Sequence, residues 1–505
     1  MRTEQGDVVG IRDESKTVDV FAGIPYAAPP VGDLRWAAPH PALQRDATLV
    51  ADDFGPAAVQ SESSFATRAA TRLLDMPLEH TLLNPYPTDE DALRLNIWRS
   101  SSLPPAQKFP VLVYVHGGAF TSGSGALPAY DGTALAARGE AIIVTINYRL
   151  GVFGFLADDE LEDTVGNQGL RDQIAALQWL QDNIAAFGGD PDRVTVAGQS
   201  AGSGSACILG ASPLAAGLVH GIIGESGGCL GTAGDRDAGD LYDTMENARD
   251  AATALSKALG GASLAEMRAM PAERIQTAAK SLTMHWWPTI DGAVLPATPA
   301  EIYAAGEQND VPLLLGSNAD EASLNLIAGM DSDPDAYKAE IRDTYGEDAG
   351  TYLQLYPGHD PDQVLESRVR AETDRSMTSA MRVWGTTAAA TGNSNVYTYF
   401  FTRTPPEPSL ERFGVYHGAE VMYAYGNLGA DGKASYGAID RRLEAEMTGY
   451  WLAFIKTGDP NGGSRSPWPT MQESPEHVLE LGDTTTISPR PRAHAVDFWL
   501  HQLGT

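Results

Sequence analysis

Short apolar runs alternate with amphipathic stretches in the middle of the chain. Val111–Val115 and Ala141–Ile146 are continuous apolar runs of strand length, as expected for strands buried on both faces of a parallel sheet. Large apolar residues then recur every three or four positions, which predicts an amphipathic helix over Gly169–Phe187. Gly188-Gly189-Asp190-Pro191 ends that helix, and Val194–Ala197 is the next expected strand. This alternation predicts an α/β fold with a large, mixed but mostly parallel central sheet flanked by helices.

The pattern differs outside this central region. Gly6–Arg12 and Val18–Phe21 are β-favouring pieces separated by polar turn residues, which predicts a small antiparallel sheet at the N-terminus. An Ala-rich, mostly helical stretch at about 232–285 interrupts the alternation, and we expect it to form a cap or gorge wall over the strand ends. No repeat or linker divides the chain, so residues 1–505 are interpreted as one domain. Strands are further expected at Gly221–Ile223, Val311–Gly316 and Val396–Phe401, and a helix at Asp440–Lys456.

Charge and hydropathy narrow the classes of partner. The chain has 66 acidic and 35 basic residues, a net charge of −31, so its surface repels nucleic acid and anionic lipid. Hydrophobic residues make up 43%, enough for a large core. The apolar runs are too short to span a bilayer, and the first residues do not resemble a signal peptide. We therefore expect a cytoplasmic protein that binds neither nucleic acid nor membrane.

The chain has only two cysteines, Cys207 and Cys229. Two cysteines exclude a disulfide scaffold, and neither lies in a CxxC or metal-ligand spacing. Buried free thiols are the favoured interpretation, although a single bridge between them stays open. No pattern in the sequence calls for a metal or an organic cofactor.

The pattern G-x-S-x-G occurs twice, around Ser200 and around Ser226. In a nucleophile elbow, a serine lies on a sharp strand-to-helix turn whose flanking glycines avoid a clash. A predicted strand precedes Ser200, and the small residues from Ala201 to Leu209 can continue as a helix. Ser226 is followed by Gly227-Gly228, which is poor helix material. Ser200 is therefore the predicted nucleophile, and Ser226 is interpreted either as a turn serine or as a hydrogen-bonding group that supports the site from behind.

Paired glycines follow the first buried strand, in His116-Gly117-Gly118-Ala119-Phe120. Their backbone N–H groups can turn toward a ligand, and acyl transfer needs such donors for the oxyanion of its tetrahedral intermediate. We predict that Gly117, Gly118 and Ala201 supply these donors. His116 is interpreted as a structural residue rather than the general base.

These motifs, with several others, resemble the type-B carboxylesterase family, the cholinesterase-like and para-nitrobenzyl-esterase-like branch of the α/β hydrolases. The resemblance covers almost the whole chain. It is carried by Phe21-Ala22-Gly23-Ile24-Pro25-Tyr26, Arg35-Trp36, Glu90-Asp91, Asn147-Tyr148-Arg149-Leu150-Gly151, Gly166-Asn167-Gln168-Gly169 and Gly458-Asp459-Pro460-Asn461.

The resemblance implies the rest of a catalytic triad. The family acid matches Glu321 in Asp320-Glu321, and the family base matches His417 in His417-Gly418-Ala419-Glu420. Nucleophile, acid and base then follow in the order of the α/β hydrolases. Ser226 matches a serine that supports the family's triad. Gln199 departs from the family, which often has Glu immediately before the nucleophile, and this departure weakens any case for a choline ester.

Two further departures concern the rim of the site. Relatives that are secreted have a cysteine where this chain has Ala92, so that bridge cannot form here. Gln60–Leu83 corresponds to a variable gorge-rim segment in relatives and is unfamiliar, so we expect it to bear on specificity. Phe120, Trp286 and Trp287 are candidates for the wall of an apolar pocket, although aromatic residues at such positions are as often part of the core.

The sequence thus predicts a serine carboxylesterase that hydrolyses small-molecule esters through Ser200, His417 and Glu321 without a metal or other cofactor. An amidase or carbamate hydrolase with the same triad stays open as an alternative, as does, more remotely, a lipase. A non-catalytic binding protein of this family is a further alternative, disfavoured because all three triad positions are filled. The natural substrate and the oligomeric state cannot be predicted from the sequence.

Overall fold

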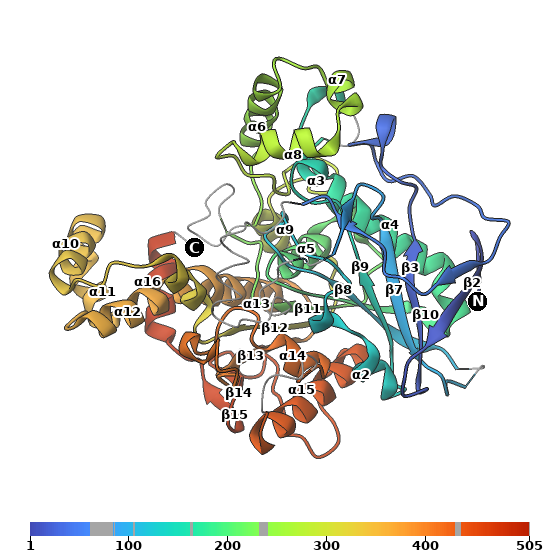
Figure 1. Ribbon diagram of the computed structural model, residues 1–505. Helices are drawn as coiled ribbons and strands as arrows, with labels where there is room; N and C mark the ends of the chain where they lie inside the picture. Colours follow the sequence, from blue (N-terminus) through green and yellow to red (C-terminus); the bar gives the residue numbers. More distant parts are fainter. Residues whose placement is uncertain are drawn as a thin grey trace.

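The chain folds around one large mixed sheet with helices on its faces (Figure 1). The computed structural model describes residues 1–60, 84, 86–104, 107–161, 165–231, 241–429 and 436–503. The 13 strands of the sheet run in the order β1-β2-β3-β7-β9-β8-β10-β11-β12-β13-β14-β15, with β4 beside β2. Neighbouring strands are parallel from β9 through β8 to β14, and antiparallel at both ends of the sheet except for β4, which is parallel to β2. The bounds of these strands are β1 Arg2–Thr3, β2 Gly6–Arg12, β3 Val18–Pro25, β4 Leu49–Ala51, β7 Arg94–Ser100, β8 Phe109–Val115, β9 Ile142–Ile146, β10 Gly189–Gln199, β11 Gly221–Glu225, β12 Leu313–Asn318, β13 Val396–Phe401, β14 His477–Leu481 and β15 Thr485–Pro489.

The interior strands include β8 and β9, which the continuous apolar runs predict, and β10 to β13, each of which overlaps a range expected to form a strand. Every residue of β8, β9, β11, β12 and β13 is buried, because helices cover both faces of this part of the sheet. Residues with small or apolar side chains are required there, whichever face they point to. A mixed, mostly parallel central sheet is therefore confirmed.

The N-terminal strands are antiparallel as predicted, but they are part of the main sheet. β2 pairs with β3 through Ile11–Val20 and Arg12–Asp19, and β3 continues into the centre of the sheet by pairing with β7. The reason is that β3 has apolar residues on both faces and is buried along most of its length. Two short strands, β5 (Ala57–Ala58) and β6 (Thr88–Asp89), form a separate parallel pair.

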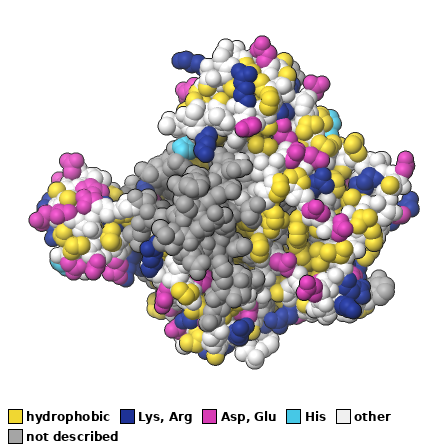
Figure 2. All heavy atoms as spheres, in the orientation of Figure 1, with side chains coloured by type: hydrophobic (Ala, Val, Ile, Leu, Met, Phe, Trp, Pro, Cys, Tyr) yellow, Lys and Arg dark blue, Asp and Glu magenta, His cyan; other side chains and the backbone are white. Residues whose placement is uncertain are grey.

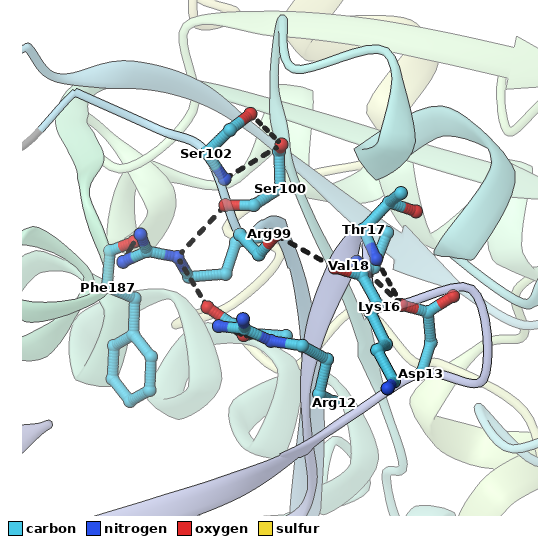
Figure 3. Close-up of polar contacts among 11 residues, drawn as sticks. Arg12, Asp13, Lys16, Thr17, Val18, Arg99, Ser100, Ser102 and Phe187 are labelled. Carbon is cyan, nitrogen blue, oxygen red and sulfur yellow. Dashed lines mark hydrogen bonds and ion pairs between the residues drawn. The ribbon is translucent and has the colours of Figure 1, made fainter.

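Polar contacts fix the β2–β3 hairpin against the rest of the sheet (Figure 3). The Asp13 carboxylate accepts a backbone N–H bond from Val18 at 2.7 Å, which closes the turn between the strands. Arg99 of β7 lies 3.7 Å from the Asp19 carboxylate and donates to the carbonyl oxygen of Phe187 at 3.0 Å. This one side chain therefore joins the hairpin, β7 and the turn that precedes β10.

The helices also follow the sequence pattern closely. The predicted helix over 169–187 is α4 (Gln168–Asn183) with a 3-10 turn over Ile184–Phe187, and Gly188 ends it with φ of 88°. The expected helix near the C-terminus is α15 (Ala438–Thr457). None of the described helices combines the length and apolar character that crossing a bilayer requires. The remaining helices named below are α3 (Gly151–Phe155), α5 (Ala201–Ala211), α13 (Ser379–Thr391), α14 (Val421–Tyr425) and α16 (Ala493–Leu503).

Two groups of helices project from this body (Figure 1). The predicted insertion contains α6 (Met245–Ala258), α7 (Leu264–Ala269) and α8 (Ala272–Lys280), which gather beside α3 at the top of the view. A second group, on the left, consists of α10 (Pro334–Tyr345), α11 (Ala349–Leu355) and α12 (Pro361–Thr373), and it packs on α16 through its own aromatic cluster. Figure 2 shows many acidic side chains on the surface of this second group, in keeping with the acidic composition.

The two cysteines form a disulfide, so the expectation of free thiols is wrong. Cys207 lies on α5 and Cys229 lies in the segment after β11, and both are buried. Because β10 and β11 are parallel neighbours, α5 and the segment after β11 emerge side by side, with 5.9 Å between the two Cα atoms. A spacing of 22 residues along the chain carries no information about this proximity.

Candidate active site

Ser200 lies on a sharp turn between β10 and α5. Its φ of 59° and ψ of −126° are strained for a residue with a side chain. The turn requires the two flanking glycines: a Cβ on Gly198 would lie 2.4 Å from the backbone of Gly202, and one on Gly202 would lie 2.0 Å from the Val115 oxygen. The geometry is that of the nucleophile elbow that the motif predicts.

Hydrogen bonds from neighbouring segments hold this turn. The Ser200 N–H donates to the Glu225 carbonyl oxygen, and the Gly204 N–H donates to the Ser200 carbonyl oxygen, both at 2.9 Å. One turn into α5, the Ser203 hydroxyl donates to the Gly227 carbonyl oxygen at 2.5 Å. The strained residue is thus fixed from both β11 and α5, which positions its side chain before any substrate arrives.

Ser226, in the second G-x-S-x-G match, has a positive φ of 55° but a different role. It is fully buried, its N–H donates to the Gly316 carbonyl oxygen at 2.8 Å, and no helix begins after it. Its hydroxyl donates to the Glu420 carboxylate at 3.4 Å. These contacts agree with the prediction that Ser226 supports the site from behind.

Two loops bring the predicted acid and base together. Glu321 follows β12, His417 lies in the segment between β13 and α14, and the Nδ1 atom of His417 is 2.5 Å from Oε2 of Glu321. Of the two side chains, 18% of His417 is exposed and 2% of Glu321. Burial lowers the pKa of His417, but the charge of Glu321 and its hydrogen bond raise that pKa more, so the net shift is upward.

The other ring nitrogen of His417 faces the nucleophile's neighbour. Nε2 of His417 lies 3.0 Å from Nε2 of Gln199, the residue immediately before Ser200. The ring of the predicted base therefore adjoins the elbow, and the three residues of the predicted triad lie in one place. His417 is thus brought to the residue that precedes Ser200, across 218 positions of the chain.

Asn318 and Glu420 complete the site, and neither was predicted from the sequence. The Asn318 N–H donates to Oε1 of Glu321 at 2.6 Å, while its side-chain amide donates to the Tyr416 carbonyl oxygen at 2.9 Å and to Glu420. Asn318 thus ties the loop of the acid to the loop of the base. The sequence held one signal, a polar residue at the very end of a buried apolar strand.

Two buried glutamates, Glu420 and Glu225, lie near the predicted triad. Burial and the charge of Glu321 raise the pKa of Glu420 to about 7. Burial and the neighbouring Glu420 likewise raise the pKa of Glu225, whose Oε1 accepts a hydrogen bond from the Trp451 indole at 2.9 Å. The raised pKa values favour the protonated, neutral form of both carboxyl groups.

The two glycines after β8 lie against the nucleophile. A Cβ on Gly117 would lie 3.0 Å from the Cβ of Ser200, and Gly118 has φ of 113°, which only glycine adopts readily. Among the described residues, the N–H groups of Gly117 and Gly118 have no backbone acceptor. Ala201 opens α5, so its N–H is one of the helix's first donors and has no acceptor within the helix. These positions agree with the predicted oxyanion hole.

His116 is not placed as a base. It is buried, its ring stacks on Tyr148 with centroids 4.6 Å apart, and Nδ1 lies 2.9 Å from the carbonyl oxygen of Gly117. Burial lowers its pKa to about 4, so the ring is neutral near pH 7. His116 thus supports the glycine turn, as the sequence suggested.

The three aromatic candidates for the pocket wall lie in the hydrophobic core. Phe120 is fully buried and packs edge-on against Phe155, and Trp286 and Trp287 are each 6% exposed. A small hollow does adjoin the site, on the side of Gln199 and His417, and its lining does not include these three aromatic residues. The rim segment predicted at Gln60–Leu83 lies outside the described residues except for Gln60, whose side chain is bonded to Gly123.

Comparisons with known proteins agree with this geometry. The model of the family described as "Carboxylesterase family" matches residues 1–499. The chain is 32% identical to a fumonisin B1 esterase of Sphingopyxis macrogoltabida, over 95% of this chain and 86% of that one. It is 33% identical to a para-nitrobenzyl esterase of Bacillus subtilis, over 97% and 96%. A solved structure of a PNB esterase superposes with a TM-score of 0.81 at 32% identity, covering 98% of each chain.

Proposed function

The chain belongs to the carboxylesterase family and is a carboxylic ester hydrolase, and from this premise we propose that Ser200, His417 and Glu321 are its catalytic triad. One observation carries the proposal: the ring of His417 lies between the Glu321 carboxylate, at 2.5 Å, and the side chain next to Ser200, at 3.0 Å. A base that is oriented by an acid and adjoins a strained serine is the arrangement that nucleophilic acyl transfer needs.

In the first step, Ser200 Oγ attacks the ester carbonyl carbon and His417 Nε2 takes the hydroxyl proton. Glu321 holds the proton on Nδ1 and stabilises the imidazolium that forms. The N–H groups of Gly117, Gly118 and Ala201 stabilise the oxygen that gains negative charge, a contribution of about 10² to 10³ in rate for each donor.

To complete the first half of the reaction, the bond between the carbonyl carbon and the alcohol oxygen breaks, His417 gives its proton to the leaving alcohol, and the acyl group stays on Ser200. Water then attacks the acyl-enzyme with His417 again as base, which releases the acid and restores the serine. Every proton transfer in this sequence passes through Nε2 of one histidine.

We propose small-molecule carboxylic esters as the substrates, since the two similar proteins named above are both called esterases. Amides and carbamates contain carbonyls that the same triad attacks, so they define the useful comparison. Two rate comparisons test this preference: an ester against the amide of the same acyl group, and the ester against a carbamate of the same alcohol. A carbamate or amide hydrolysed faster than its ester would overturn the proposed substrate class.

A serine substitution with a matched control tests the triad. Ser200→Ala should reduce turnover of a small chromogenic ester by at least about 10⁴-fold, while the exposed Ser102→Ala should leave it unchanged. A fluorophosphonate should label the peptide that contains Ser200 and not the one that contains Ser226. Near-normal turnover by a folded Ser200→Ala protein, or an adduct on Ser226, would refute the assignment.

A further inference from the structure

The side chain of Gln199 is hydrogen-bonded to Nε2 of His417, the ring atom that takes the proton of Ser200 in the proposed mechanism. The Gln199 side chain is fully buried, its Nε2 lies 3.0 Å from Nε2 of His417, and its Oε1 has no hydrogen-bond partner among the described residues. The described residues also contain no hydrogen bond from the Ser200 hydroxyl to that ring. In this structure, the amide of Gln199 and not the nucleophile is the neighbour bonded to Nε2.

The direction of this bond follows from the other side of the ring. Nδ1 lies 2.5 Å from Glu321, and a carboxylate only accepts, so Nδ1 carries a proton. In the neutral ring Nε2 then has a lone pair and no hydrogen, and it accepts from the Gln199 amide, which donates. This lone pair is also the acceptor for the Ser200 proton, and it takes one strong hydrogen bond at a time.

The charge of Glu321 beside His417 favours the protonated ring, the imidazolium, over the neutral ring. The titratable groups of this region come from three elements, Glu321 after β12, Glu420 before α14 and Glu225 at the end of β11, and the hollow beside the ring adds Glu407 and the tyrosines Tyr130, Tyr416, Tyr423 and Tyr436. Burial raises the pKa of Glu225, Glu420 and the tyrosines Tyr130, Tyr416 and Tyr423, which favours their neutral forms. Glu321 is therefore the main charge beside the ring. Negative charge stabilises the imidazolium, which cannot act as a base. Burial and the amide of Gln199 oppose this effect, and among the described residues the amide is the one side chain that is hydrogen-bonded to Nε2.

We propose that Gln199 is a positioning residue that holds His417 neutral and away from Ser200 in the resting enzyme, and that releases it when a substrate enters. The inference rests on the proposed function and deepens it. Gln199 and His417 border the same hollow, so the amide can leave the ring without entering packed core. Its Oε1 has no partner to lose, so the movement breaks only the bond to the ring.

A glutamate in this position would act in the opposite direction. A carboxylate cannot donate to the unprotonated Nε2, and its charge stabilises the imidazolium. The neutral amide therefore extends activity to lower pH, at the expense of the negative charge that would attract a cationic alcohol group. This links a single residue to both the pH dependence and the kind of ester that the site accepts.

The experiment is the pH dependence of kcat/KM for a small neutral ester in three variants. Gln199→Met keeps the shape of the side chain and removes its hydrogen-bond donor. The acid limb, which is the pH range below the optimum in which kcat/KM falls as His417 is protonated, should therefore move up by about 0.5 to 1 pH unit. Gln199→Glu adds a charge and should move it up by about 1 to 3 units. Gln308→Met is the matched control and should leave the acid limb in place. Gln308 is buried, and its side-chain amide donates a hydrogen bond to Thr391.

The outcomes separate this inference from the proposed function. If the unaltered enzyme does not hydrolyse the ester at any pH, so that no acid limb can be measured, the triad itself is refuted. Turnover with an acid limb unmoved in both Gln199 variants would refute only the role of Gln199. If neither variant folds, the nitrogen NMR spectrum of His417 in the unaltered protein decides: an unprotonated Nε2 at neutral pH is expected, and a doubly protonated ring would overturn the inference.

Discussion

The disulfide between Cys207 and Cys229 should stabilise the fold by an amount that can be worked out from its position. The bridge closes a loop of 22 residues, for which the chain-entropy relation gives about 11 cal/mol/K, or about 3 kcal/mol at 25 °C. A chain of 505 residues unfolds with an entropy of about 1.1 kcal/mol/K. Replacing both cysteines by alanine should therefore lower Tm by about 3 °C.

The assay compares the unaltered protein with Cys207→Ala/Cys229→Ala, each with and without a strong reductant. Reductant should lower the Tm of the unaltered protein and leave that of the double variant unchanged. The difference that persists in reductant then measures the packing of the two buried sulfur atoms alone. Ester turnover should survive in the variant, because hydrogen bonds to Glu225, Gly204 and Gly227 hold the elbow independently of the bridge.

A count of free thiols is the measurement that can refute the disulfide between Cys207 and Cys229. The unaltered protein, denatured without reductant, should take up no alkylating label, and two labelled cysteines would show that the bridge does not form. The measurement also bears on location, because disulfides persist in oxidising compartments and are rare in a reduced cytosol. The expected cytoplasmic location stays a prediction, and the thiol state of protein taken directly from cells is its sharpest test.

Three further substitutions test individual parts of the site and core. Glu321→Gln should lower kcat by about 10⁴, because the amide cannot stabilise the imidazolium; a loss below tenfold contradicts its role as acid. Gly202→Ala places a Cβ 2.0 Å from the Val115 oxygen, so it should abolish activity or soluble expression, and an active variant would exclude the elbow geometry. Arg149→Met leaves the buried Asp172 without its ion pair and should cost about 3–5 kcal/mol by denaturant unfolding, with Asp172→Asn added as partial rescue.

Local patterns were sufficient for most of the architecture. Continuous apolar runs at Val111–Val115 and Ala141–Ile146 predicted buried strands, because a strand covered on both faces tolerates few polar residues. The period of three to four over 169–187 gave α4 with its terminating glycine. Whether the N-terminal hairpin forms its own sheet was not predictable, because strand partners are chosen over long distances in the chain.

The candidate site was predicted in two different ways. Ser200 followed from the physics of the elbow, in which small residues and a preceding strand are local requirements. Glu321 and His417 came from the resemblance to a family, since nothing in their own spacing marks them as neighbours. The placement of Phe120 and Trp286 as pocket wall or core depended on packing, and the structure places both in the core.

By itself the sequence determined the main strands and helices around the nucleophile, which serine can occupy a strained turn, and that an acidic surface surrounds a large core. The helices α10, α11 and α12 and the strands β14 and β15 were not predicted from it. Only the tertiary structure decided that Cys207 meets Cys229, that Asn318 joins the acid and base loops, and that the amide of Gln199 faces His417 across 218 positions. The physical reason is one of range. Hydrophobic period and steric crowding act between near neighbours in the chain, whereas a contact between distant loops exists only once parallel strands have set the relative positions of their ends.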